Sequence, residues 1–300
     1  MTPKLLLYVI FLLFTSCVIS QNDLLINTYN RETRSLNGSW NYIIDPYESG
    51  YYNYRRVPYD TQEQPWKNAF FLNSKPENKS DLVEYNFDNN DSLLVPGDWN
   101  TQKKELLYYE GSLWYKKSFD YNLDKKAKRL FIYFEASNYK TEVYLNGKKL
   151  GTHIGGFTPF NFDITNLVEK ENNHIIVKVD NKRTKEGVPT LNTDWWNYGG
   201  LTRDVKLIET NETFIQDYMI QLDPNDSKKI NGFITLKGKD KSKKKVTITI
   251  PELGISKNIK TNDSGEATFE IPSETINYWS DKKPKLYDVT ISLDDTKLND

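Results

Sequence analysis

The sequence has few of the residues that build covalent cross-links and metal sites. Its 300 residues include one cysteine, Cys17, and two histidines, His153 and His174. A single thiol excludes an intramolecular disulfide, so the fold must rest on an apolar core. The histidines lie far apart and lack the spacing of metal ligands. We therefore expect ordinary hydrogen-bonded histidines, no zinc site and no cofactor.

An excess of either charge is also missing. The chain carries 40 Lys and Arg against 41 Asp and Glu, a formal net charge of −1. Binding to nucleic acid needs a surplus of positive charge to neutralise phosphates, so nucleic acid is not an expected partner.

The N-terminus has the pattern of an export signal. Lys4 is followed by an apolar run, Leu5 to Phe14, which is too short to predict a membrane span. Val18 and Ser20 fit a cleavage site, which predicts a signal peptide at residues 1–20. A lipid anchor on Cys17 is the alternative, although Phe14 stands where such sites prefer Leu. Both readings predict export in a bacterium, to the periplasm, the medium or the outer surface as a lipoprotein.

Aromatic residues, in contrast, are abundant, with 20 Tyr, 14 Phe and 7 Trp. The densest segment is Asp194–Val205, which combines aromatic rings, carboxylates, an amide and the pair Gly199-Gly200. A buried strand would alternate polar and apolar residues and would avoid Gly-Gly. The mixture favours a wall that meets a polar ligand such as a sugar. The alternative is a packed aromatic corner of a β-sandwich.

Strand signals run through most of the chain. Asn146-Gly147 between two β-rich runs predicts a tight hairpin. Residues 22–34 are polar and are expected to lie across the surface, and residues 46–91 are expected to form long loops. From about residue 210 the aromatics thin out. Further strands are expected at 214–222, 230–237, 245–250, 266–271 and 286–293, with the spacing of a small immunoglobulin-like sandwich.

Several short motifs occur together in one order. They are Leu36-Asn37-Gly38-Ser39-Trp40, Val95-Pro96-Gly97-Asp98-Trp99, Gly111-Ser112-Leu113-Trp114-Tyr115, Val143-Tyr144-Leu145-Asn146-Gly147, Gly155-Gly156-Phe157-Thr158-Pro159-Phe160, Asp194–Val205 and Pro284-Lys285-Leu286-Tyr287. In this order they resemble the non-catalytic N-terminal half of family 2 glycoside hydrolases, the group of β-galactosidases, β-glucuronidases and β-mannosidases. The resemblance runs from about residue 35 to the C-terminus.

The resemblance implies an all-β chain: a jelly-roll, galactose-binding-like β-sandwich followed by an immunoglobulin-like β-sandwich. We expect the sugar-binding domain at 21–210 and the immunoglobulin-like domain at 211–300. The family's catalytic (β/α)₈ barrel, which holds two glutamates and a retaining mechanism, is expected to be absent from this chain. No catalytic residue is therefore assigned.

The resemblance also suggests substrate-binding residues. Asp194 matches an acid that reaches into the barrel's mouth and bonds a hydroxyl of the sugar. Asp98 stands where some relatives place a second sugar-contacting residue, often Asn; an Asx-turn is an equal alternative. Asn197, Tyr198 and Trp196 are expected on the same rim. At least one of Trp195 and Trp196 is expected in the core, and Arg203 is expected to pair with Asp204 or Asp163.

The resemblance therefore implies that this chain is the accessory part of an exported β-glycosidase. A β-glucuronide is the favoured substrate, and a β-galactoside is the near alternative. Its partner is then an oligosaccharide or glycoside. The first alternative is a stand-alone carbohydrate-binding module without chemistry. The second is a structural role in which both sandwiches serve homo-oligomerisation.

Overall fold

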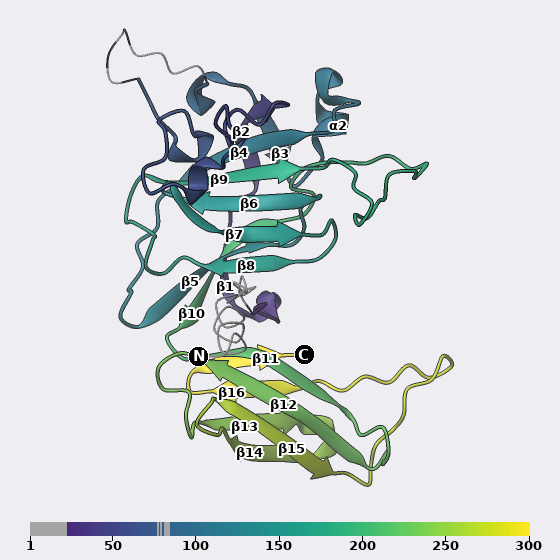
Figure 1. Cartoon of the computed structure of the whole chain (residues 1–300). Helices are drawn as coiled ribbons and strands as arrows, with labels where there is room; N and C mark the ends of the chain where they lie inside the picture. Colours follow the sequence, from purple (N-terminus) through teal and green to yellow (C-terminus); the bar gives the residue numbers. More distant parts are fainter. Residues whose placement is uncertain (1–22, 77, 79, 81–84) are drawn as a thin grey trace, which may run out of the picture.

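The computed structural model describes residues 23–76, 78, 80 and 85–300. The predicted signal peptide and Cys17 lie outside these residues. The described chain forms two β units, one above the other in Figure 1, and the chain passes between them from β10 to β11. Its α-helical part is α2 (Trp99–Gln102), and none of the described helices is both long and apolar enough to cross a membrane.

The upper unit is a sandwich of two antiparallel sheets. The larger sheet has the order β3-β2-β4-β9-β6-β7, and the smaller has the order β1-β10-β5-β8. The larger sheet contains Ser92–Val95 (β3), Gly38–Asp45 (β2), Ser112–Phe119 (β4), Asn173–Asp180 (β9), Lys140–Leu145 (β6) and Lys148–Ile154 (β7). The smaller contains Glu32–Ser35 (β1), Val205–Asn211 (β10), Lys128–Phe134 (β5) and Phe160–Asp163 (β8). The expected jelly-roll sandwich is confirmed.

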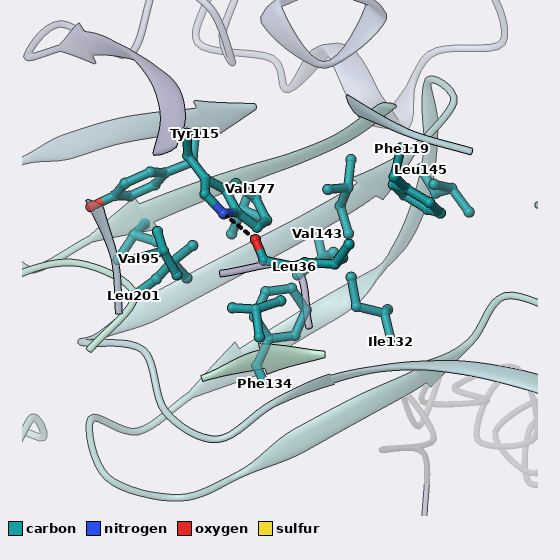
Figure 2. Close-up of a cluster of buried hydrophobic side chains, with 14 of the residues drawn as sticks. Leu36, Val95, Tyr115, Phe119, Ile132, Phe134, Val143, Leu145, Val177 and Leu201 are labelled. Atoms are coloured by element: carbon teal, nitrogen blue, oxygen red, sulfur yellow. Dashed lines mark hydrogen bonds between the residues drawn. The ribbon is translucent and has the colours of Figure 1, made fainter. Parts of the chain in front are cut away.

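The main core lies between these sheets. Figure 2 shows Ile132 and Phe134 of the smaller sheet facing Val143 and Val177 of the larger one. Because side chains alternate along a strand, apolar residues two positions apart in β4, β6 and β9 enter this core, among them Leu113 with Tyr115, Val143 with Leu145, and Val177 with Val179. Burying such aliphatic and aromatic side chains stabilises the unit by about 1.5–3 kcal/mol for each large side chain.

The opposite face of the larger sheet is also buried, because the segment between β2 and β3 covers it. Phe71 stacks on Tyr144 of β6 with ring centroids 4.6 Å apart, and Phe70 contacts Trp114 of β4. This explains why the central strands read as nearly continuous apolar runs. The segment contains short 3-10 helices at Tyr59–Thr61, Phe70–Leu72 and Phe87–Asn89.

Buried charges fix this covering segment to the sheet. Lys178 of β9 bonds Glu48 of the segment at 2.9 Å and Glu142 of β6 at 3.3 Å. Asp60 of the segment accepts bonds from Tyr144 at 2.8 Å and Lys149 at 2.6 Å. Burial by itself raises the pKa of Glu48, but the hydrogen bond and the charge of Lys178 outweigh it and lower this pKa to about 2.

The lower unit is a sandwich of three and four strands, with the orders β11-β12-β15 and β14-β13-β16-β17. The strands are Phe214–Leu222 (β11), Lys229–Lys237 (β12), Lys245–Ile250 (β13), Ile255–Lys260 (β14), Glu266–Pro272 (β15), Thr290–Leu293 (β16) and Thr296–Asn299 (β17). The immunoglobulin-like sandwich is confirmed. The sequence missed β14 and β17, and the strand expected at 286–293 begins only at Thr290.

Two local expectations had different outcomes. The hairpin is confirmed, since Asn146 and Gly147 both have positive φ, 50° and 78°. The surface position of residues 22–34 is wrong in part. Leu25 is buried, and its N–H donates to Asn161 of β8 at 2.8 Å. This segment covers the outer face of the smaller sheet, so the polar Asn161 is buried as well.

Candidate functional site

The aromatic-rich segment that starts at Asp194 lies in the long connection between β9 and β10. This connection extends at the right of Figure 1 near α2. Its glycine pair is fixed to the sandwich. Trp99 N–H donates to the Gly199 carbonyl at 2.9 Å, and Gly200 exchanges two backbone bonds with Asn138. A Cβ on Gly199 would lie 2.1 Å from the Trp99 ring, so only glycine fits this contact.

Three buried asparagine side chains hold Asn197 and Tyr198, the two residues that precede the glycine pair. Asn181 donates to the Asn197 carbonyl at 2.9 Å, and the Asn197 side chain donates back to the Asn181 carbonyl. Asn138 donates to the side-chain oxygen of Asn197 at 3.2 Å and to the Tyr198 carbonyl at 2.5 Å. Both polar atoms of the Asn197 side chain are therefore used in bonds that hold the loop. Asn197 also lines the cavity described below.

Arg183 holds the other side of the loop. Its guanidinium donates to the Thr193 carbonyl at 2.8 Å and the Trp195 carbonyl at 3.2 Å, the two neighbours of Asp194 in the chain. Its Nε donates to Glu110 at 3.1 Å. Planar donors in a fixed fork suit this arrangement, which pins the backbone on both sides of Asp194.

These contacts form the floor of an open cavity of about 270 Å³. Its lining contains Asn100, Tyr108, Glu110, Arg183, Thr193, Asp194, Trp195, Trp196 and Asn197. Asp194 is exposed, and no hydrogen bond or ion pair joins its carboxylate to another described residue. An anchored backbone thus presents a free carboxylate to the solvent.

Exposed rings stand beside this carboxylate. Trp196 lies 5.3 Å from Tyr108 and 6.2 Å from Tyr198, measured between ring centroids. The expectation that Trp195 or Trp196 is buried is wrong, since they are 59% and 41% exposed. Trp99 is buried in the core nearby, whereas these two indoles form an exposed aromatic surface next to Asp194.

Asp98 occupies a different position. It is the N-cap of α2: its carboxylate accepts bonds from the Thr101 N–H at 2.7 Å and the Thr101 hydroxyl at 2.8 Å. Capping satisfies an N–H at the helix start and accounts for the acid locally. A sugar contact by Asp98 stays a prediction, as do the contacts of Asp194, Trp196, Asn197 and Tyr198.

Other expectations about single residues need correction. Arg203 is exposed and has no ion pair among the described residues, because Asp163 pairs with Arg129 and Asp204 accepts a bond from Asn37. His153 stacks on Phe160 and bonds Thr158.

His174 departs from the expected full hydrogen bonding, because its buried Nε2 has no partner. Burial lowers the pKa of both His153 and His174. No group of three metal-ligating side chains converges within the described residues.

Two family models match the chain, one for each of its two β units. Residues 33–211 match the model of the sugar binding domain of glycosyl hydrolases family 2, and residues 213–300 match a second model of that family.

The chain belongs to glycosyl hydrolase family 2.

Curated relatives of this family 2 chain include β-galactosidases and β-glucuronidases. It is 30% identical to a β-galactosidase of Thermoanaerobacter pseudethanolicus over 73% of the chain and 31% of the relative. It is 24% identical to a β-glucuronidase of Paenibacillus borealis over 90% of the chain and 44% of the relative. The chain therefore spans less than half the length of these relatives.

Solved structures share the fold. The β-glucuronidase of Bifidobacterium dentium complexed with coumarin-3-O-glucuronide matches 90% of the family 2 chain and 47% of its own, with a TM-score of 0.67 and 22% identity. A β-glucuronidase from an uncultured Clostridium gives a TM-score of 0.66 at 22% identity. At this level of identity the likeness concerns the β-sandwich architecture.

Sequence reasoning missed the side chains that position the site. Glu110 precedes β4 and Arg183 follows β9, and they meet because Ser112 pairs with Asp180 across the antiparallel strands. That register brings the beginning of one strand to the end of the other. The motif that begins at Gly111 indicated one of these two places, but nothing in the sequence states which strands pair.

Proposed function

We propose that the chain supplies the sugar-binding and immunoglobulin-like domains of an exported retaining β-glycosidase. In this proposal the site loop, residues 193–198, completes a sugar pocket whose catalytic groups belong to another part of the full-length protein. The observation that carries the proposal is the exposed, unpaired Asp194 carboxylate on a backbone that Arg183 and Asn197 hold in place.

The chemistry of the cavity supports a saccharide. A carboxylate accepts hydrogen bonds from two neighbouring hydroxyls, which fixes the orientation of a sugar and discriminates strongly between epimers. The rings of Trp196 and Tyr108 offer flat apolar faces for the C–H side of a sugar. A site that is open to solvent and shallow gains a second wall when another domain covers it.

Among substrates we propose a β-glucuronide, with a β-galactoside as the near alternative. Relatives named β-glucuronidase and β-galactosidase both match the chain, and one structural neighbour is complexed with a glucuronide. The test is hydrolysis of aryl-β-glucuronide and aryl-β-galactoside by the full-length gene product. We expect faster turnover of the glucuronide; equal turnover, or none on either, contradicts the substrate assignment.

The exposed aromatic row also supports a second candidate, a carbohydrate-binding module that acts without chemistry. Tyr108, Trp196 and Tyr198 form a surface of the kind on which sugars stack. This candidate predicts sugar binding by the 300-residue chain alone that is lost in Trp196→Ala. Calorimetry that detects no heat with a broad sugar panel removes it.

Export is part of the proposal and rests on the N-terminal pattern around Leu5–Phe14. Mass spectrometry of the protein produced in its bacterium tests it. A mature N-terminus at Gln21 supports signal cleavage, and a diacylglyceryl group on Cys17 supports anchoring. An intact Met1 in the mature protein contradicts both.

A further inference from the structure

A second cavity lies in the segment between β2 and β3, on the covered face of the larger sheet. Its volume is about 390 Å³, larger than that of the cavity beside Asp194. Its described lining is Tyr47, Ser49, Tyr52, Asn53, Tyr54, Arg56, Tyr59, Lys67, Asn68, Ala69, Phe70, Asn73, Ser74, Tyr85 and Phe87. The two cavities share no described lining residue, and Figure 1 shows this segment at the end of the sheet away from α2.

The floor of this cavity is firmly held. Gly50 accepts a bond from Phe70 N–H at 3.1 Å, and a Cβ on Gly50 would lie 2.2 Å from the Phe70 ring. The ion pair of Glu48 with Lys178 then ties the same segment to β9. A long connection that is anchored in this way presents a preformed hollow, and such loops are commonly functional.

The wall of the cavity exposes aromatic faces. Tyr47 and Tyr54 are each 83% exposed, and Tyr85 is 43% exposed. No bond joins their hydroxyls to another described residue, and the same holds for the side chains of Asn68 and Asn73. Tyrosine has a flat apolar body and a polar tip, and amides supply both donors and acceptors. This combination suits a ligand with apolar C–H faces and many hydroxyls.

The charge of the cavity indicates the type of saccharide. Arg56 brings a guanidinium to the described lining, and one of its NH2 groups donates to the Tyr47 carbonyl at 3.1 Å. Arg56 stacks on Tyr52 at 4.4 Å and bonds Glu48 at 3.2 Å, so its guanidinium is fixed in direction. Its side chain is still 62% exposed. Arginine matches the planar geometry of a carboxylate and binds it through charge-assisted hydrogen bonds.

We propose that this cavity is a separate, non-catalytic subsite for an oligosaccharide that contains uronic acid. Tyr54 and Tyr47 stack on its sugar rings, and Arg56 binds a uronate carboxylate. The subsite would hold an acidic glycan on the protein away from the Asp194 loop. It requires neither turnover nor the second wall of the Asp194 cavity.

The test is calorimetry of the 300-residue chain with tetrasaccharides of galacturonate, mannuronate and glucuronate. Methyl-esterified tetragalacturonate serves as the matched ligand without charge. We expect at least one acidic tetrasaccharide to bind, and the galacturonate ester to bind no more than about one-tenth as tightly as its acid. Failure of all three acids to bind, or equal affinity for the galacturonate acid and its ester, overturns the proposal.

Variants locate the binding. Tyr54→Ala and Arg56→Gln should each weaken the acidic ligand about tenfold, whereas the exposed Tyr29→Ala should leave its affinity unchanged. Trp196→Ala, in the other cavity, should also leave it unchanged. If Trp196→Ala abolishes binding while Tyr54→Ala does not, the proposal is wrong, because the glycan then occupies the Asp194 site.

Discussion

At the scale of single residues, the position of Asp194 depends on Arg183. Its guanidinium binds the carbonyls of Thr193 and Trp195 and is itself oriented by Glu110. An aspartate that is to meet a ligand hydroxyl gains from such preorganisation, because no ordering is then required on binding.

We therefore expect Arg183→Ala to speed amide hydrogen exchange of residues 193–197 at least about tenfold, since both anchoring bonds are lost. Glu110→Gln should have a smaller effect in the same region. Mass spectrometry of exchanged peptides measures both. Unchanged protection of the loop in Arg183→Ala would show that Asn197 alone holds it.

Two substitutions can distinguish the two possible roles of Asp98, as a helix cap and as a residue that contacts the sugar. Asn caps a helix about as well as Asp, whereas Ala loses about 1 kcal/mol. We expect Asp98→Ala to lower the melting temperature and Asp98→Asn to preserve it. If Asp98→Asn retains stability yet strongly reduces turnover in the full-length enzyme, the carboxylate contacts substrate and the role as a simple cap is wrong.

Glu48 gives the upper unit a defined response to acid. Its folded pKa is lowered from 4.5 to about 2, so its contribution to stability is complete above pH 4.5 and is lost as the pH falls toward 2. Lys178 has a raised pKa despite burial, because Glu142 and Glu48 lie beside it, and it stays charged throughout this range.

We expect the urea midpoint, followed by tryptophan fluorescence, to fall between pH 4.5 and 2 more steeply in the unmodified chain than in Glu48→Gln. Every tryptophan except Trp279 lies in the upper unit, so the signal reports mainly on it. Parallel pH profiles for the two proteins would show that the Lys178 pair contributes nothing to the acid response.

At the scale of elements, the Gly199-Gly200 pair joins the site loop to the sandwich. Gly199 packs against the Trp99 ring and Gly200 has a φ of 133°. Gly199→Ala should destabilise the upper unit by about 1–3 kcal/mol through overpacking. Thermal unfolding measures this loss. Gly199 does not have a positive φ, so the expected loss is one of packing, whereas Gly254→Ala, with open space around the Cβ and a φ of 64°, measures backbone strain alone. An unchanged unfolding temperature in Gly199→Ala contradicts the packing argument.

Features set by neighbouring residues were predictable from the sequence. The hairpin at Asn146-Gly147 needs two positive φ values, and the strands of the second unit show alternation and turns. Features set by distant pairing were not. The meeting of Glu110 with Arg183 and the burial of Asn161 depend on which strands and segments lie side by side.

The exposed tryptophans show a related limit. Burial is the usual state of a Trp side chain, and Trp40, Trp99 and Trp114 follow it. Trp195 and Trp196 do not, because the loop that carries them is anchored by backbone and amide bonds rather than by its rings. The local sequence does not distinguish a buried ring that anchors a loop from a ring that the loop leaves exposed to solvent.

At the scale of the molecule, the N-terminal segment links the two units. Arg31 donates to the Ile215 carbonyl at 2.7 Å, and Asn27 donates to the Tyr218 hydroxyl at 2.7 Å and the Asn299 carbonyl at 2.9 Å. Leu25 and Phe214 pack with Phe131 in one cluster where the units meet. Through these contacts the N-terminal segment packs against both units.

The central claim is that the Asp194 loop completes the sugar pocket of a larger enzyme. The most direct test is kcat/KM for aryl-β-glucuronide in the full-length protein with Asp194→Asn, alongside Glu171→Gln as an exposed acidic control outside the cavity. We predict a loss of about 100-fold for Asp194→Asn, about 2.7 kcal/mol of transition-state binding, with an unchanged melting temperature and no effect of Glu171→Gln. A kcat/KM for Asp194→Asn within about twofold of the unmodified enzyme would contradict the claim.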